Sequence, residues 1–341
     1  MSQPGRSIVK PPSRGRTVAL SGACSFLGRN LVDVLEGDES VSRIVTIDIE
    51  RPITGGPKTR FYEVDLTVPS ADERIAEILG AESVDTLVHL AFLATPTHAA
   101  AWAHELESVG TMHVLNGARQ APPKSLVLRS HTFLYGATAK NPNFMAEQDQ
   151  LAAPAEEPFF ADKIAAEREV ARFAEAHPET KVTVLRTAPL VGPTVSNFMT
   201  RYLSRRRMVT LMGFDPLWQF VHEVDALAAL KLAVDRQVPG TFNIVGDGVL
   251  PLSKVVSLTG NSTLPIPHPM ARPTVATLWA TQLCSWPPAF VPYLRYLCVA
   301  SGKQARERLG FYPACTTEEA LLDFISAQRL RDARLVREVE R

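Results

Sequence analysis

The chain lacks a surplus of charge of either sign, and it has few cysteines. Its 341 residues contain 36 Lys and Arg against 36 Asp and Glu, so the formal net charge is zero. A nucleic-acid-binding protein shows a basic surplus that neutralises phosphates, and we therefore predict no nucleic-acid partner. The four cysteines follow neither the spacing of zinc ligands nor that of a disulfide framework. This pattern predicts free thiols, a cytoplasmic protein and no metal site.

The chain also lacks an uninterrupted apolar run. Its first 16 residues are rich in Pro, Ser and Arg, which is typical of a flexible tail and not of a signal peptide. Residues 273–294 carry no formal charge, but Pro287, Pro288 and Pro292 interrupt them, so a helix that spans a membrane is not expected. A lid, an oligomer contact and a patch that touches a membrane surface are the alternatives for this segment.

What the chain does have is a regular alternation of short apolar strands and helices. Strands are expected at residues 17–21, 43–49, 60–64, 86–91, 125–130 and 181–186, with helices between most of them. Strands that are apolar on both faces and separated by helices predict an α/β fold with a doubly wound parallel sheet of the Rossmann type.

Beyond residue 192 the alternation loosens, although residues 239–245 are typical of a late strand that returns to the sheet. We therefore expect three parts: a tail over 1–16, a nucleotide-binding domain over 17–192, and a lobe over 193–341. The lobe is expected to be smaller, to cap the substrate and to be interleaved with the main sheet.

The first strand runs into a loop with two glycines, and a helix follows. At the start of a helix, unpaired N–H groups and the positive end of the helix dipole attract an anion, and glycines let the backbone approach it closely. Ser25 stands where a loop of three glycines has its middle glycine, and its small hydroxyl can donate to a phosphate. The loop predicts a pyrophosphate site formed by Gly22, Cys24, Ser25, Phe26, Leu27 and Gly28.

Asp48 strengthens this prediction. It closes the second strand, about 20 residues after Gly28, where a carboxylate accepts hydrogen bonds from both ribose hydroxyls of an adenosine. Its charge would repel a 2′-phosphate, which favours NAD over NADP. We therefore predict NAD as the cofactor, with Asp48 and Ile49 beside its adenosine.

Further segments resemble the extended short-chain dehydrogenase/reductase family, in its NAD-dependent epimerase/dehydratase group that includes UDP-glucose 4-epimerase. The resemblance covers nearly the whole chain from about residue 17. It is carried by YEVDL, HLA, LYG, a K-x-x-x-E helix, LRTAPLVGP, FVHEVDA and LGFYP, at residues 62–66, 89–91, 134–136, 163–167, 185–193, 220–226 and 309–313.

The resemblance implies further cofactor contacts and a partner. It places Asp65 and Leu66 beside the adenine and implies contacts near the pyrophosphate and the nicotinamide from Leu90, Ala91, Phe92, Pro189 and Lys163. It also implies a small-molecule substrate and a homodimer. The dimer would form through the helices expected at 99–119 and 161–176, packed as a four-helix bundle.

The chain departs from the family where the proton chemistry belongs. In the family, a Tyr and a Lys stand one helical turn apart, and the Lys lowers the pKa of the Tyr whose phenolate exchanges the proton. Here Lys163 is present, but Phe159 occupies the position of the Tyr. His131, followed by Thr132, stands where the family has a Ser or Thr.

Two hypotheses follow from this departure. In the first, Lys163, His131 and Thr132 form a rearranged acid/base set of an oxidoreductase or epimerase, with His131 titrating near neutrality. Asp162 or Glu147 can contribute to that set. In the second, catalysis is lost and the chain is an NAD-dependent binding or sensing protein.

Trp218 bears on the substrate. Nucleotide-sugar epimerases often have an Arg two residues before the aromatic of the segment at 220–226, and here that position holds Trp218. An indole offers stacking and one donor but no charge. A phosphate contact stays open through nearby arginines, namely Arg201, Arg205, Arg206 and Arg207. Two substrate classes are therefore expected, a nucleotide sugar or an apolar hydroxyl compound.

Overall fold

The computed structural model describes residues 15–339, with side chains placed through residue 331. Most of the predicted tail, residues 1–14, lies outside this range. Arg16, which we assigned to the tail, already belongs to the first strand.

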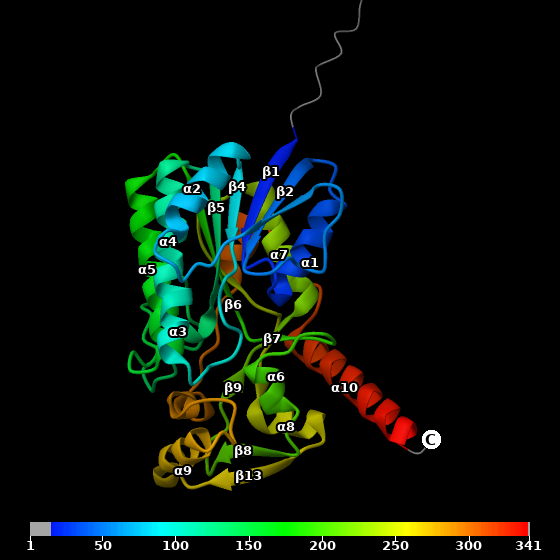
Figure 1. The fold of residues 1–341 in the computed structure, drawn as a ribbon. Coiled ribbons are helices and arrows are strands. Elements are labelled where there is room, and N and C mark those ends of the chain that lie inside the picture. Colours follow the sequence, from blue (N-terminus) through cyan, green and yellow to red (C-terminus); the bar gives the residue numbers. More distant parts are fainter. Residues whose placement is uncertain (1–14, 340–341) are drawn as a thin grey trace, which may run out of the picture.

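Seven parallel strands form the central sheet (Figure 1). They are β1 (Arg16–Ser21), β2 (Val41–Asp48), β3 (Thr59–Glu63), β4 (Thr86–His89), β5 (Ser125–His131), β6 (Lys181–Thr187) and β11 (Gly240–Ile244). Their order is β11-β6-β5-β4-β1-β2-β3, and every pair of neighbours runs parallel. This order confirms the predicted doubly wound sheet, in which ligands bind at the carboxyl ends of the strands.

Helices cover both faces of the sheet. On one face lie α1 (Phe26–Glu36) and α7 (Glu223–Arg236); on the other lie α2 (Ala71–Ala81), α4 (Gly110–Gln120) and α5 (Pro158–Ala176). Successive strand residues alternate between these layers. In β5, Val127 packs in the core with α1 and α7, whereas Leu126 and Leu128 pack in the core on the opposite face. Burial on both faces explains why the strand is apolar throughout.

The helix expected at 99–119 is interrupted. It consists of α3 (Ala100–His104), a π-helical turn over Glu105–Val109 and α4. A π turn inserts an extra residue and so changes which side chains face inward. Here it turns Glu107 into the protein interior. The homodimer expected through this helix and α5 stays a prediction.

The second half of the chain contributes a smaller lobe below the sheet in Figure 1, as predicted. Its elements are α6 (Phe198–Leu203), β8 (Arg207–Leu211), α8 (Leu252–Thr259), β13 (Ser262–Ile266), α9 (His268–Ala280), a 3-10 segment (Pro288–Leu294) and α10 (Thr317–Val339). Short strand pairs join β7 (Leu190–Val191) to β10 (Val221–His222) and β9 (Leu217–Trp218) to β12 (Leu250–Pro251). The expected late strand is β11, which returns to the sheet beside β6. The domain boundary at residue 192 stays a prediction.

The uncharged segment 273–294 folds into this lobe. Trp286, Phe290 and Tyr293 are buried there and belong to the core of the lobe. Among residues 15–339, no helix combines the length and the apolar composition that crossing a bilayer requires.

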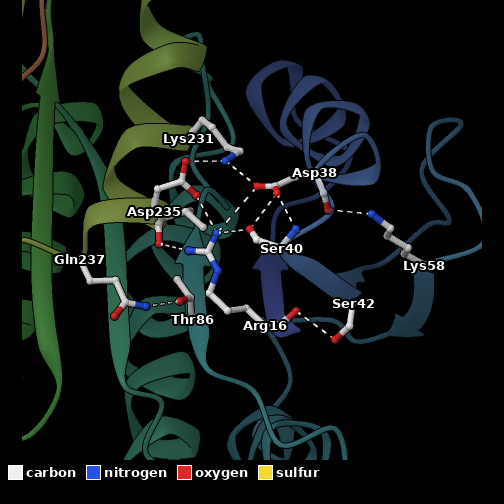
Figure 2. Close-up of polar contacts among 10 residues, drawn as sticks. Arg16, Asp38, Ser40, Ser42, Lys58, Thr86, Lys231, Asp235 and Gln237 are labelled. Carbon is white, nitrogen blue, oxygen red and sulfur yellow. Dashed lines mark hydrogen bonds and ion pairs between the residues drawn. The ribbon is translucent and has the colours of Figure 1, made fainter. Parts of the chain in front are cut away.

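An ion-pair network ties the start of the sheet to the second half of the chain (Figure 2). Arg16 donates to Asp235 at 2.8 Å and to the Val234 carbonyl at 2.9 Å, while Lys231 lies 2.6 Å from Asp38. Burial disfavours the charge of Asp38, but hydrogen bonds from Lys231 and Ser40 outweigh it and lower its pKa. The network fixes β1 against α7, so the loop at the other end of β1 has a rigid base.

Candidate functional site

The loop between β1 and α1 is packed so closely that only glycine fits at its two ends. Gly22 has a φ of +76°, and a Cβ on it would lie 2.5 Å from the Ala91 nitrogen. A Cβ on Gly28 would lie 2.5 Å from the Gly22 oxygen. Ser25 caps α1, because its hydroxyl oxygen accepts from the Gly28 N–H at 3.1 Å. The hydroxyl proton stays available to a phosphate.

Asp48 lies directly beside this loop. One carboxylate oxygen accepts from the Cys24 N–H at 2.8 Å, and the other accepts from the Ile49 N–H at 2.8 Å. Each oxygen keeps a further lone pair, which fits a pair of ribose hydroxyls. Burial, followed by Asp48, raises the pKa of the Cys24 thiol to about 11, so this thiol is neutral at pH 7. Arg29 also lies near Cys24 and adds a positive charge to this corner.

A cavity of about 60 Å³ runs from the loop to the end of β5. It brings together many of the predicted cofactor contacts, namely Ser25, Phe26, Leu27, Leu90, Phe92 and Pro189. Arg129, His131, Phe133 and Phe198 line its other end.

The other predicted cofactor contacts lie outside that lining. The Ala91 backbone packs against Gly22. Leu66 is buried, whereas Ile49 and Asp65 are exposed, and Asp65 accepts from the Thr67 N–H at 2.8 Å. Their predicted contacts with the adenosine stay predictions.

Lys163 is held by a carboxylate that the sequence did not reveal. Its Nζ lies 2.7 and 2.8 Å from the two carboxylate oxygens of Glu107, and both side chains are buried. Glu107 also accepts from the Leu93 N–H at 2.6 Å. Burial lowers the pKa of Lys163 and raises that of Glu107, while their mutual attraction opposes both shifts. The Phe159 ring centroid lies 3.7 Å from the same Nζ, so its π face meets the ammonium.

His131 lines the cavity, and its buried Nε2 has no hydrogen-bond partner among the described residues. Burial, assisted by the charges of Arg129 and Lys163, lowers its pKa well below the usual value. This lowering contradicts the expectation that His131 titrates near neutrality, because burial disfavours the charged imidazole and it would be a third positive charge beside Arg129 and Lys163. Thr132 is buried and absent from the cavity lining, which Phe133 supplies instead.

The two carboxylates considered as helpers have other partners. Asp162 pairs with His104 at 2.6 Å, and its second oxygen is buried without a partner among the described residues. Glu147 accepts from the Asn243 N–H at 2.9 Å and so holds β11.

Several family-like positions are structural. Glu167 forms a buried ion pair with Arg186 at 2.7 Å, which joins α5 to β6. The Tyr135 hydroxyl donates to Asn243 at 2.7 Å and accepts from Arg186 at 2.9 Å. These contacts join α5, β6, β11 and the segment that follows β5.

A second hollow, of about 30 Å³, adjoins the cavity and has no charged residue in its wall. It shares Phe133, Phe198 and Met199 with the cavity. The rest of its wall consists of Tyr202, Trp218, Trp286, Phe290, Tyr293 and Leu294. The Trp218 indole N–H donates to the Tyr293 carbonyl at 3.3 Å, so its one donor is already used.

The arginines near this hollow do not enter it. Arg206 and Arg207 line a separate groove on the lobe together with Arg329. We therefore find no support for a phosphate contact between the arginines at 205–207 and a substrate in this hollow.

Comparisons with known proteins agree with this fold. The sequence model of the NAD dependent epimerase/dehydratase family matches residues 18–245. An uncharacterized Mycobacterium tuberculosis protein, Rv0501, is 29% identical over 326 residues, covering 94% of this chain and 86% of its own length. A Streptomyces sp 3-diazoavenalumate denitrifying reductase is 26% identical over 291 residues, covering 78% of this chain and 92% of its own length.

Among solved structures, MoeE5 in complex with UDP-glucuronic acid and NAD has a similar fold. The TM-score is 0.70 at 22% identity, and the match covers 92% of this chain and 99% of MoeE5.

Proposed function

Because the chain belongs to the NAD-dependent epimerase/dehydratase family, we propose that it is an oxidoreductase or epimerase whose substrate is an apolar hydroxyl compound. The observation that carries this proposal is the aromatic hollow that adjoins the cofactor cavity. A nucleotide diphosphate needs cationic or polar partners, and the wall of this hollow has no charged residue; Arg129 lies in the adjoining cavity. A further support is the Streptomyces sp relative, whose name denotes a reductase of 3-diazoavenalumate and no nucleotide sugar.

The residues present fit an NAD molecule. The N–H groups of Gly22, Cys24, Ser25 and Gly28 donate within the protein. The N–H groups of Phe26 and Leu27, in the first turn of α1, would therefore face the pyrophosphate, and Asp48 would accept from the adenosine ribose. Bound NAD supplies a hydride acceptor, or as NADH a hydride donor. We expect this chemistry at the end of β5, beside His131, because the cavity extends from the loop to that point.

We propose Lys163 as the group that exchanges a proton; its side chain is buried and lies outside the cavity lining. Its ammonium has three N–H donors, of which two point to Glu107, so one is left for a ribose or substrate oxygen. Burial favours release of a proton from this ammonium. A neutral His131 serves as a hydrogen-bond partner that orients the substrate oxygen. Phe159 cannot exchange a proton, and its apolar ring covers the Lys163 ammonium.

A non-catalytic NAD-binding protein is the second candidate. It is favoured by the same ion pair, since Glu107 and Phe159 together occupy most of the surroundings of Lys163. This candidate requires NAD to bind without any redox change.

Turnover separates the candidates. Aromatic alcohols such as cinnamyl alcohol are expected to reduce bound NAD, measured by NADH absorbance, and UDP-glucose is expected to leave it unchanged. Lys163→Met should abolish the signal, whereas the matched variant of an exposed lysine, Lys140→Met, should retain it. The proposal would be refuted if the protein epimerised UDP-glucose and did not oxidise any of the aromatic alcohols. NAD binding without turnover of any compound would favour the second candidate.

A further inference from the structure

Arg129 is a charged side chain that has no ion-pair partner among the described residues. It lies on β5, two residues before His131, and lines the cavity. Among the described residues it forms no ion pair within 4.0 Å and no side-chain hydrogen bond, and its Nε is buried without a partner. Burial lowers its pKa to about 10, so the guanidinium is charged at pH 7. A charge without a partner in such a place destabilises the free protein.

Nearby groups do not neutralise it. Glu107 is close enough to interact electrostatically with Arg129, but both of its oxygens bond to Lys163. His131 is neutral and so carries no negative charge that could offset the guanidinium. The cavity end at Arg129 is therefore electropositive and selects an anion.

The strand register gives the backbone spacing between Arg129 and the pyrophosphate loop, whose residues Ser25, Phe26 and Leu27 line the same cavity. Ser21 pairs with His89, and His89 pairs with Leu128, so Arg129 is level with Gly22 two strands away. Neighbouring strands are about 4.8 Å apart, which puts the Arg129 backbone roughly 10 Å from the loop. At the end of β5, Arg129 and Lys163 both act electrostatically on His131.

The walls around this electropositive end are aromatic. Phe133 and Phe198 line both the cavity beside Arg129 and the uncharged hollow. A ligand that spans both spaces has an anionic end and an apolar, ring-bearing body. A guanidinium binds a carboxylate through two parallel hydrogen bonds.

We propose that Arg129 binds the carboxylate of an aromatic acid substrate, so that the substrate is held between this guanidinium and the aromatic hollow. This inference rests on the proposed function, because it assumes that the hollow takes the substrate. The alternative source of the anion is a phosphate of the cofactor.

Calorimetry of the NAD-saturated protein with cinnamate and cinnamamide tests this inference. The two probes share one shape and differ by one charge, and cinnamate is expected to bind at least about 10-fold more tightly, as for hydrogen bonds to charged groups. Arg129→Met should abolish this preference and leave the Kd of NAD unchanged. The exposed Arg207→Met is the matched control and should behave as the wild type.

Thermal unfolding adds a readout that is independent of ligand. Arg129→Met is expected to raise the Tm of the ligand-free protein, because it removes a charge that has no partner. A lower Tm would identify Arg129 as a structural countercharge and overturn the inference.

The binding outcomes are also distinguishable. If the wild type binds cinnamate and cinnamamide equally well, the inference is overturned and the proposed function is not. The same holds if Arg129→Met weakens NAD binding and keeps the preference for cinnamate. If neither probe binds to the wild type, the proposed aromatic substrate site fails, and the inference fails with it.

Discussion

Glu107→Ala is expected to lower the free energy of unfolding by roughly 3–5 kcal/mol, the range for breaking one partner of a buried ion pair. The Lys163 ammonium would remain buried with neither of its two hydrogen bonds to Glu107. The Leu93 N–H would lose its acceptor as well. Urea unfolding followed by circular dichroism measures the change.

Two variants make this result specific. Glu105→Ala removes an exposed carboxylate from the same π turn and should unfold like the wild type. Glu107→Leu combined with Lys163→Met removes both charges and should recover most of the lost stability. If the double variant is no more stable than Glu107→Ala, the pair is not the source of the effect.

Asp48→Ala is expected to weaken NAD binding by about 100-fold or more, since hydrogen bonds to a charged group contribute about 1.5–3 kcal/mol each. Two ribose hydroxyls would lose their acceptor, and the Cys24 and Ile49 N–H groups would lose theirs. Arg29 remains, so the variant should also discriminate less against NADP than the wild type does. Calorimetric titration with each nucleotide measures both effects.

The control is Asp33→Ala, which removes an exposed carboxylate from α1. It should leave both affinities unchanged. Unchanged NAD affinity in Asp48→Ala would contradict the assignment of this site, and tighter binding of NADP than of NAD by the wild type would contradict the cofactor preference.

The sheet and the nucleotide loop were predictable because their signals are local. Burial on both faces makes a strand such as β5 apolar throughout, and a loop that must pack against the neighbouring strand end requires Gly22 and Gly28. Boundaries differed by only a few residues, and the late strand at 239–245 returned to the sheet as β11.

The chemistry of the site was not predictable, because it arises from contacts between distant segments. Glu107 looks like one more charged helix residue until the π turn and the packing of α5 bury it against Lys163. The pKa of His131 depends on Arg129 and Lys163, and only the fold brings Lys163 to that place. The aromatic hollow likewise combines residues from β9 with residues near position 290.

The account depends on one placement: a nucleotide whose adenosine lies at Asp48 and whose nicotinamide reaches the aromatic end of the cavity. A crystal structure of the protein with NAD measures it directly. We expect the ribose hydroxyls at the Asp48 carboxylate and the nicotinamide beside Phe159 and Lys163, facing the uncharged hollow. A nucleotide bound in the opposite direction, or outside the cavity, would contradict the account.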